Sequence, residues 1–228
     1  MDFDRLQPAY ALARRLRGKA GIVKVGSQLF TAEGPRAVRK LVELGFEIFL
    51  DLKFHDIPNT VAGAVSSAAA LPGIRLLTIH TTGGVAMMSA AQGALGRAKD
   101  HPAILGVTVL TSMGPQTLKE VGISGTPASR ALALARLAKK AGLGGVVASA
   151  HETAAIRRAC GRKFLIVVPG VRPADSSAND QSRVATPVEA IRAGADYLVV
   201  GRPITAAVDP AKAAESIAKE IASAARRP

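Results

Sequence analysis

The chain alternates short β-branched runs with Ala- and Leu-rich segments of helical period along its whole length, and this alternation is what most constrains its fold. Repeated strand-then-helix units imply parallel strands joined by right-handed crossovers. The fold class is therefore α/β, as either an open doubly wound sheet or a closed (β/α)8 barrel. Seven runs bounded by Gly or Pro predict strands: Ile22–Val25, Glu47–Leu52, Arg75–His80, Ile104–Leu110, Gly145–Ser149, Phe164–Val168 and Tyr197–Val200.

Eight segments predict helices. Four of them carry an apolar stripe at i, i+3, i+4 and i+7, starting at Leu6, Val38, Leu134 and Ala214. The other four are compatible with helix: Ile57–Leu71, Gly84–Lys99, His151–Cys160 and Pro187–Ala193. No Gly-rich dinucleotide fingerprint follows an early strand, and 228 residues suit a compact barrel. We therefore predict a single (β/α)8 TIM-type barrel domain over residues 1–228.

The predicted barrel is one strand short. Eight helices face only seven strands, because the chain opens on a helix. Either Met1 is an interior position of a longer natural reading frame, or the barrel closes with a vestigial first strand. We expect a first strand truncated at the N-terminus.

Composition narrows the class of protein. No stretch of eighteen apolar residues and no apolar signal core is present, so we expect a cytoplasmic protein with no membrane partner. The single cysteine, Cys160, has no partner for a disulfide or a metal cluster, and we expect it to pack in the core. The net charge of +13 favours anionic partners such as phosphates or nucleic acid, but an aromatic content of 4% argues against a single-strand stacking surface.

The segment FLDLKFHDIPNTV, residues 49–61, contains the greatest concentration of candidate catalytic residues. Active sites of barrels lie at the carboxyl ends of the strands, and this segment ends one. Asp51 and Lys53 stand at i and i+2 and so point to the same face, with Asp56 just beyond. Two carboxylates around an ammonium would keep all three charged and position the lysine as a proton donor. An ion-paired cluster that only closes the strand end is the alternative.

Lys24 lies in the middle of the apolar strand GIVKVG. Such a lysine either extends past an edge to water or points inward to meet a carboxylate. In the barrel its strand neighbours the strand of Asp51 and Lys53, within reach for ion pairing. An alternating array of Lys24, Asp51, Lys53 and Asp56 is the simplest interpretation.

Other strand ends carry weaker candidates. Gly201 and Arg202 end the last strand, where barrels often bind phosphate through backbone N–H groups, a helix N-terminus and a bidentate arginine. A simple Gly turn beside a surface Arg is the alternative. Thr111 and Ser112 could hydrogen-bond a ligand. The polar segment 169–186 has no period and is either a functional lid or disordered.

Six blocks stand in order along the chain: KVG at 24–26, DLKFHDIPNT at 51–60, LTSM at 110–113, PGVRP at 169–173, DQSRVATP at 180–187 and GADYLVVGRPIT at 194–205. Together they resemble the orotidine 5′-phosphate decarboxylase family in its short bacterial form. The resemblance covers essentially the whole chain, and several blocks in register are far more specific than a lone motif.

The resemblance implies decarboxylation of orotidine 5′-phosphate to uridine 5′-phosphate, the last step of de novo pyrimidine synthesis, without a metal or organic cofactor. It implies that Lys53 donates the proton to C6 of the pyrimidine, that Asp51 lies near the departing carboxylate, and that Lys24 and Asp56 complete the array. The implied substrate-binding residues are Asp2 at the ribose, Thr111 and Ser112 at the pyrimidine, Pro169, and Arg172, Gln181, Gly201 and Arg202 at the phosphate and lid. It also implies a homodimer in which Asp56, Ile57 and Thr60 reach the partner's site.

Two other functions compete with this expectation. Sugar-phosphate decarboxylases and synthases of the same barrel group carry a similar Asp-x-Lys-x-x-Asp array but use magnesium, and the HDIPNT and DQSRV blocks argue against them. A basic nucleic-acid-binding protein would explain the charge of +13 and would bind nucleic acid in a salt-dependent way. We expect a small phosphorylated substrate and no nucleic acid.

Overall fold

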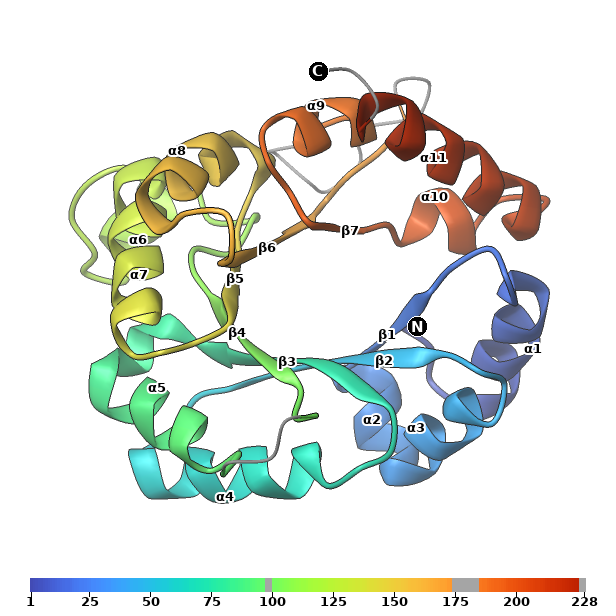
Figure 1. The fold of residues 1–228 in the computed structure, drawn as a ribbon, viewed down its shortest axis with the longest axis horizontal. Helices are drawn as coiled ribbons and strands as arrows, with labels where there is room; N and C mark the ends of the chain where they lie inside the picture. Colours follow the sequence, from blue (N-terminus) through green and yellow to red (C-terminus); the bar gives the residue numbers. More distant parts are fainter. Residues whose placement is uncertain (97–99, 174–184, 226–228) are drawn as a thin grey trace.

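A computed structural model of the chain describes residues 1–96, 100–173 and 185–225. Its seven strands pair in parallel, each with the next along the chain, and the helices surround them (Figure 1). The strands curve into a barrel that is nearly closed. Within the described residues it stays open at one place, because no pairing joins the last strand to the first. The strands are β1 Ile22–Gly26, β2 Glu47–Phe54, β3 Ile74–His80, β4 Ala103–Val107, β5 Gly145–Val147, β6 Leu165–Pro169 and β7 Tyr197–Val199.

The seven strand predictions and the barrel are confirmed, and the eight predicted helices are all present. These are α1 Leu6–Leu16, α3 Pro35–Val42, α4 Pro58–Ala69, α5 Gly84–Gly93, α7 Pro127–Lys140, α8 Ala150–Cys160, α9 Pro187–Arg192 and α11 Pro210–Ala225. Four short helices were not predicted: α2 Ser27–Glu33, the 3-10 helix η1 Thr81–Gly83, α6 Pro115–Glu120 and α10 Arg202–Thr205. Each is too short to show a periodic apolar stripe.

The strands are apolar on both faces because each face is buried. Phe49, Leu76, Leu105 and Val167 form a cluster inside the barrel. Their sequence neighbours point outward into the larger core under the helices, where for example Leu50 and Leu77 pack. Continuous apolar runs, rather than alternating ones, are what a parallel sheet covered on both faces requires.

The N-terminal residues run beside β1. The amino group of Met1 donates a hydrogen bond to the backbone oxygen of Lys24 at 2.6 Å. Figure 1 marks this end of the chain next to β1, on the side where β7 approaches. Asp2 is thereby brought beside the Lys24 side chain.

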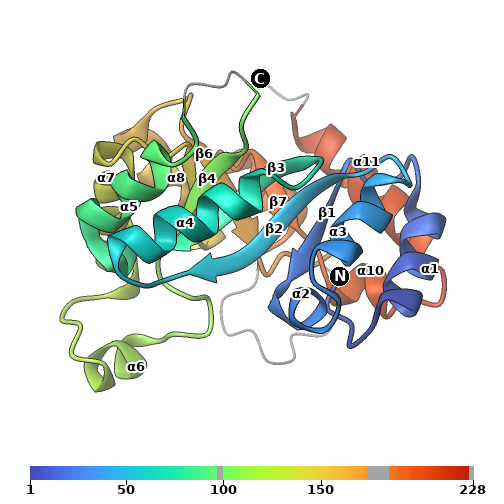
Figure 2. The ribbon, with the colours of Figure 1, turned by 90° about the horizontal axis from the view of Figure 1, so that it is seen from below.

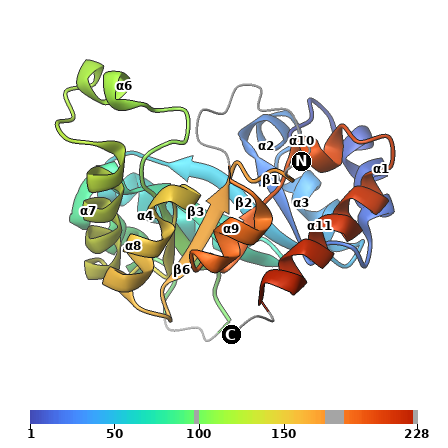
Figure 3. The same cartoon turned by 90° about the horizontal axis from the view of Figure 1, so that it is seen from above.

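Helix α6 and the N-terminus lie on the side toward which the strands point (Figures 2 and 3). Helix α6 stands away from the barrel on that side, at the end of a long excursion between β4 and α7. The carboxyl ends of the strands and the long connections therefore meet on one side of the molecule. No helix in the described residues is long and apolar enough to cross a membrane.

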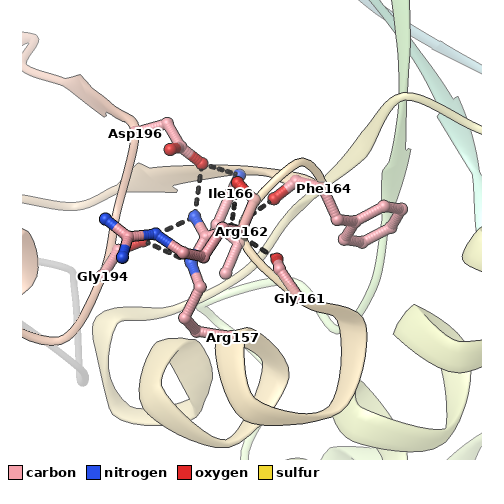
Figure 4. Close-up of polar contacts among 7 residues, drawn as sticks. All are labelled: Arg157, Gly161, Arg162, Phe164, Ile166, Gly194 and Asp196. Carbon is pink, nitrogen blue, oxygen red and sulfur yellow. Dashed lines mark hydrogen bonds and ion pairs between the residues drawn. The ribbon is translucent and has the colours of Figure 1, made fainter.

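A single arginine joins the amino ends of β6 and β7 on the opposite side (Figure 4). The guanidinium of Arg157, near the end of α8, donates to the backbone oxygens of Gly161, Arg162, Phe164 and Gly194 at 2.7 to 3.2 Å. It also pairs with the Asp196 carboxylate, which accepts the Ile166 N–H at 2.7 Å. We call this group the Arg157 clamp.

Candidate active site

A cavity of about 990 Å³ opens into the barrel. Nine of the residues singled out in the sequence line it: Asp2, Lys24, Asp51, Lys53, Thr111, Pro169, Arg172, Gly201 and Arg202. They come from β1, β2, β6 and the segments that follow β4, β6 and β7, with Asp2 from the chain start. Parallel strands of a barrel deliver their carboxyl ends to one place, which is why residues so far apart in sequence share a cavity.

Four charged side chains alternate in sign at this end of the barrel. The Lys24 ammonium lies 3.3 Å from carboxylate oxygens of both Asp2 and Asp51. The Lys53 ammonium lies 2.8 Å from the same Asp51 oxygen that Lys24 contacts. Lys24 therefore points inward rather than out past an edge. We call Asp2, Lys24, Asp51 and Lys53 the charged array.

Asp51 is the centre of the charged array. Its residue is only 8% exposed, and each carboxylate oxygen has partners: Oδ2 faces the two ammonium groups, and Oδ1 accepts the Thr78 hydroxyl at 3.0 Å. Burial by itself would raise the pKa of the Asp51 carboxyl. The charges of Lys24 and Lys53 and the hydrogen bonds to the carboxylate outweigh that effect, and the pKa lies below its ordinary value of 3.8. Asp51 is ionised at neutral pH.

The strand that carries Asp51 and Lys53 is irregular. Leu50 pairs with Leu77 of β3, whereas Phe54 pairs with Ile79, so three residues of β2 stand against Thr78 alone. Lys53 lies in this bulge with φ +52°, and among the described residues it is the one non-glycine residue with positive φ. A non-glycine residue in this region carries a strain of about 1–3 kcal/mol, which must be offset by its surroundings. The bulge directs the Lys53 ammonium to Asp51.

Two histidines adjoin the charged array. The rings of His55 and His80 lie 5.3 Å apart between centroids. Burial lowers the pKa of His80 below its ordinary 6.5, and the neighbouring charges of His55 and Lys53 lower it further, against the opposing effect of Asp51. His80 is therefore neutral at pH 7. It is half-buried and adds no positive charge beside Lys53.

The cavity is also lined by two arginines and by Gly201. Gly201 and Arg202 are exposed at the start of α10, and nothing lies within 4 Å of the position that a Cβ on Gly201 would take. Arg172, in contrast, is only 6% exposed. Pro169 ends β6, and Thr111 follows the β4 end. Two guanidinium groups thus line the same cavity, and planar guanidinium groups are suited to bind an oxyanion.

Five predicted site residues are not among those that line the cavity. Asp56, Ile57 and Thr60 are exposed, with Ile57 at 67%, and the Asp56 carboxylate accepts its neighbour's N–H at 2.6 Å instead of meeting a lysine of this chain. The charged array within one chain is therefore completed by Asp2 rather than by Asp56. Ser112 is exposed. Gln181 lies outside the described residues.

Thr78 is a site residue that was not predicted: it is fully buried and contacts both Asp51 and Lys53. A polar residue inside the apolar strand IRLLTIH is the signal that could have found it, because a buried hydroxyl needs partners. Gly26 was also missed as a packing requirement. A Cβ there would lie 2.5 Å from an Asp2 carboxylate oxygen and 3.2 Å from the Lys24 nitrogen.

No group of three or more His, Cys, Asp or Glu side chains among the described residues is placed to hold a metal ion. The two carboxylates that reach the cavity, on Asp2 and Asp51, each face an ammonium group. The donor set at this end of the barrel is thus one of alternating charges rather than a set of oxygen ligands converging on one point.

Comparison with known proteins agrees with the resemblance. An orotidine 5′-phosphate decarboxylase of Syntrophotalea carbinolica is 52% identical over 98% of this chain and 93% of its own length. One of Nitrosococcus oceani is 49% identical over 98% of this chain and 96% of its own length. The crystal structure of orotidine 5′-phosphate decarboxylase from Lactobacillus acidophilus superposes with a TM-score of 0.85 at 38% identity, covering 97% of this chain and 96% of that one.

The match to a whole family is equally extensive, and it confirms the resemblance drawn from the six sequence blocks. It begins at residue 1 and runs to residue 217, so it includes every strand and the start of α11. The chain belongs to the Orotidine 5'-phosphate decarboxylase / HUMPS family.

Proposed function

We propose that this protein converts orotidine 5′-phosphate and a proton to uridine 5′-phosphate and carbon dioxide. The observation that carries the proposal is the Lys53 ammonium, held 2.8 Å from the buried Asp51 carboxylate and lining the cavity. Relatives about half identical over nearly the whole chain bear the name of this activity. Both the chemistry of the cavity and the relatives support the same reaction.

The difficult step is the loss of carbon dioxide. The bond between C6 and the carboxylate carbon breaks, and its electron pair stays on C6 in an sp² orbital that the ring does not delocalise well. The Lys53 ammonium donates its proton to C6, and the resulting amine regains a proton from water. An acceleration in the upper part of the range for enzymes, about 10¹⁷-fold, corresponds to a lowering of the activation free energy by about 23 kcal/mol.

Electrostatic preorganisation is the largest contribution that the charged array can supply. Lys53 is held by an ion pair and by a bulged backbone before the substrate arrives, so little reorganisation accompanies the development of negative charge at C6. Lys24, which contacts the same Asp51 oxygen as Lys53, helps to keep that carboxylate ionised, so the proton on Lys53 remains available for C6. We propose that Asp51 lies next to the departing carboxylate and Asp2 next to the ribose.

The phosphate would bind where Arg202, Gly201 and Arg172 line the cavity. Arg202 supplies a planar guanidinium and Gly201 an unobstructed backbone, while Arg172 lines the same cavity from the segment after β6. We propose Thr111 and Ser112 at the pyrimidine, and Pro169 and Gln181 as further substrate contacts. Binding energy from a phosphate remote from C6 can stabilise the reacting geometry at the other end of the substrate.

We further propose that the chain acts as one barrel domain within a cytoplasmic homodimer. Asp56, Ile57 and Thr60 are exposed and directly follow the carboxyl end of β2, the strand that carries Asp51 and Lys53, which leaves them accessible to a second chain. These residues would enter the partner's site and bring Asp56 to the partner's charged array. The lone cysteine, Cys160, is buried and free, as suits a reducing compartment.

The proposed reaction is tested by incubating the purified protein with orotidine 5′-phosphate and a chelator, and measuring carbon dioxide and uridine 5′-phosphate. Equal amounts of both products are expected, and the Lys53→Ala variant serves as the control for a contaminating activity. Turnover that requires added magnesium would contradict the proposal, as would the absence of product.

A further inference from the structure

The bulge in β2 interrupts the hydrogen bonds that would join it to β3. Regular pairing holds on either side, at Leu50 with Leu77 and at Phe54 with Ile79. Between them, three residues of β2 face only Thr78 of β3. Backbone groups in such a stretch lose their ladder partners and need others, because a buried unpaired N–H is costly.

Thr78 supplies the missing partner through its side chain. Its hydroxyl oxygen accepts the Lys53 N–H at 2.9 Å, and the same hydroxyl donates to Asp51 Oδ1 at 3.0 Å. Thr78 is fully buried, so water cannot replace either bond. One hydroxyl thus connects the backbone of Lys53 to the carboxylate that its own ammonium faces.

The two bonds constrain each other. A hydroxyl has one proton, and because that proton goes to Asp51, the lone pairs are left for the Lys53 N–H. The positive φ of Lys53 is unfavourable for a non-glycine residue, so this backbone conformation depends on contacts with the rest of the fold, such as the hydrogen bond to Thr78. The hydrogen bond from Thr78 also acts to lower the pKa of Asp51, which keeps the partner of Lys53 charged.

We propose that Thr78 is a positioning residue for the decarboxylation: its hydroxyl holds the Lys53 backbone in the bulged conformation and orients Asp51, so that the Lys53 ammonium faces C6 of the substrate. This inference rests on the proposed function for the role of Lys53. Thr78 itself does not touch the substrate, and it is not among the residues that line the cavity.

The test compares two variants of Thr78 with one matched control. Thr78→Val keeps the shape and removes the hydroxyl, whereas Thr78→Ser keeps the hydroxyl. Thr81→Val is the control, because Thr81 is equally buried and its hydroxyl donates to the Val107 backbone oxygen at 2.7 Å, away from the charged array. Each protein is assayed for kcat and KM, and its thermal unfolding is recorded.

A kcat loss of about 10- to 100-fold is expected in Thr78→Val, because displacements of about 1 Å at a reacting group have effects of this size. The KM is expected to change by less than about threefold, since contacts to substrate are retained. Thr78→Ser and Thr81→Val should both stay within about threefold of the unaltered kcat. A kcat in Thr78→Val within that range, or an equal loss in Thr81→Val or Thr78→Ser, would overturn the proposal.

The role of Thr78 is also tested with a second pair of variants and by amide hydrogen exchange. If Thr78→Val does not fold, Thr78→Ser is compared with Thr78→Ala, which both lack the methyl group but differ in the hydroxyl; equal kcat values would refute the role.

Amide hydrogen exchange of Lys53 does not depend on turnover. Exchange at Lys53 should accelerate in Thr78→Val but not in Thr81→Val, and unchanged exchange would refute the role of Thr78 even in a protein that lacked decarboxylase activity. Absence of that activity in the unaltered protein would instead refute the proposed function.

Discussion

The ammonium of Lys53 lies 2.8 Å from the carboxylate of Asp51, and the two side chains meet because the strand that carries both is bulged between them. In a regular strand, residues at i and i+2 share a face but stand almost 7 Å apart along it, at about 3.3 Å per residue. Lys53 stands in the bulge with a positive φ, so this regular strand geometry does not apply to the pair. The ion pair is thus a product of local backbone distortion as much as of charge.

Replacement of Lys53 by alanine tests its role directly. We expect Lys53→Ala to lose turnover by about 10⁴-fold or more, because it removes both the proton donor and the charge that stabilises C6. The measurement is kcat, with circular dichroism to show that the fold is retained. Lys40→Ala removes an exposed lysine paired with Glu43 and should leave kcat unchanged. Near-normal turnover of Lys53→Ala would exclude it as the donor.

Arg202 should act on binding through the phosphate. Hydrogen bonds to a charged group contribute about 1.5–3 kcal/mol, so Arg202→Ala should weaken binding of uridine 5′-phosphate by about 10- to 100-fold. Uridine, which has no phosphate, should bind the variant and the unaltered protein equally. Calorimetric titration of both ligands checks this. An unchanged affinity for the nucleotide would remove Arg202 from the phosphate site.

His80 should make stability depend on pH below 6.5. Burial and the charges of His55 and Lys53 lower its pKa below 6.5, so between that pKa and 6.5 the folded state binds fewer protons than the unfolded state. Its contribution to stability is therefore complete above pH 6.5 and is lost as the pH falls through the folded pKa. Unfolding by denaturant across this range should show a flatter pH dependence in His80→Gln. Identical slopes for the two proteins would contradict the assignment.

The Arg157 clamp should stabilise the fold without affecting chemistry. Arg157→Ala removes the donor to four backbone oxygens and the cationic partner of the Asp196 carboxylate, and we expect a loss of about 2–4 kcal/mol in unfolding free energy. Arg158 is exposed on the same helix, and Arg158→Ala is the matched control. Chemical denaturation measures both. Equal stabilities of the two variants would show that the clamp contributes nothing.

Shared sites in a homodimer predict complementation between two inactive chains. In each proposed site, one chain supplies Lys53 and its partner supplies Asp56. A dimer of one Lys53→Ala chain and one Asp56→Ala chain therefore has one site that carries both changes and one site that carries neither. Exchange of subunits in an equal mixture should restore about a quarter of the unaltered activity, as random pairing requires. Light scattering checks the dimer itself. A mixture that stays inactive despite subunit exchange would place Asp56 in its own chain's site or outside any site.

The sequence was sufficient for the architecture because every buried strand is a short apolar run between turn residues. It was also sufficient for Lys24 and Asp51, since charged residues inside such runs must find each other at the barrel interior. It did not reveal α2, α6 or α10, whose few residues carry no period. Short helices after strands depend on tertiary contacts rather than on local pattern.

The bulge could not be predicted for a different reason, whereas the polar Thr78 inside an apolar strand was a signal that the sequence did contain. Regular two-residue alternation already placed Asp51 and Lys53 on one face, so nothing in the sequence indicated an irregular register. A positive φ at lysine runs against local preference and follows only from what β3 offers opposite it. Asp56 is exposed in the single chain, and its proposed entry into a partner's site involves a second chain, which one sequence does not describe.

The Arg157 clamp joins the amino ends of two strands, whereas the charged array lies at the carboxyl ends of others. Residues at opposite ends of a barrel share no partners, and substitutions at such positions have nearly additive effects. Substitutions that raise the unfolding free energy at the amino ends can therefore offset substitutions at the carboxyl ends that lower it. The stability expected from the clamp and the chemistry proposed for the charged array thus depend on two separate sets of residues.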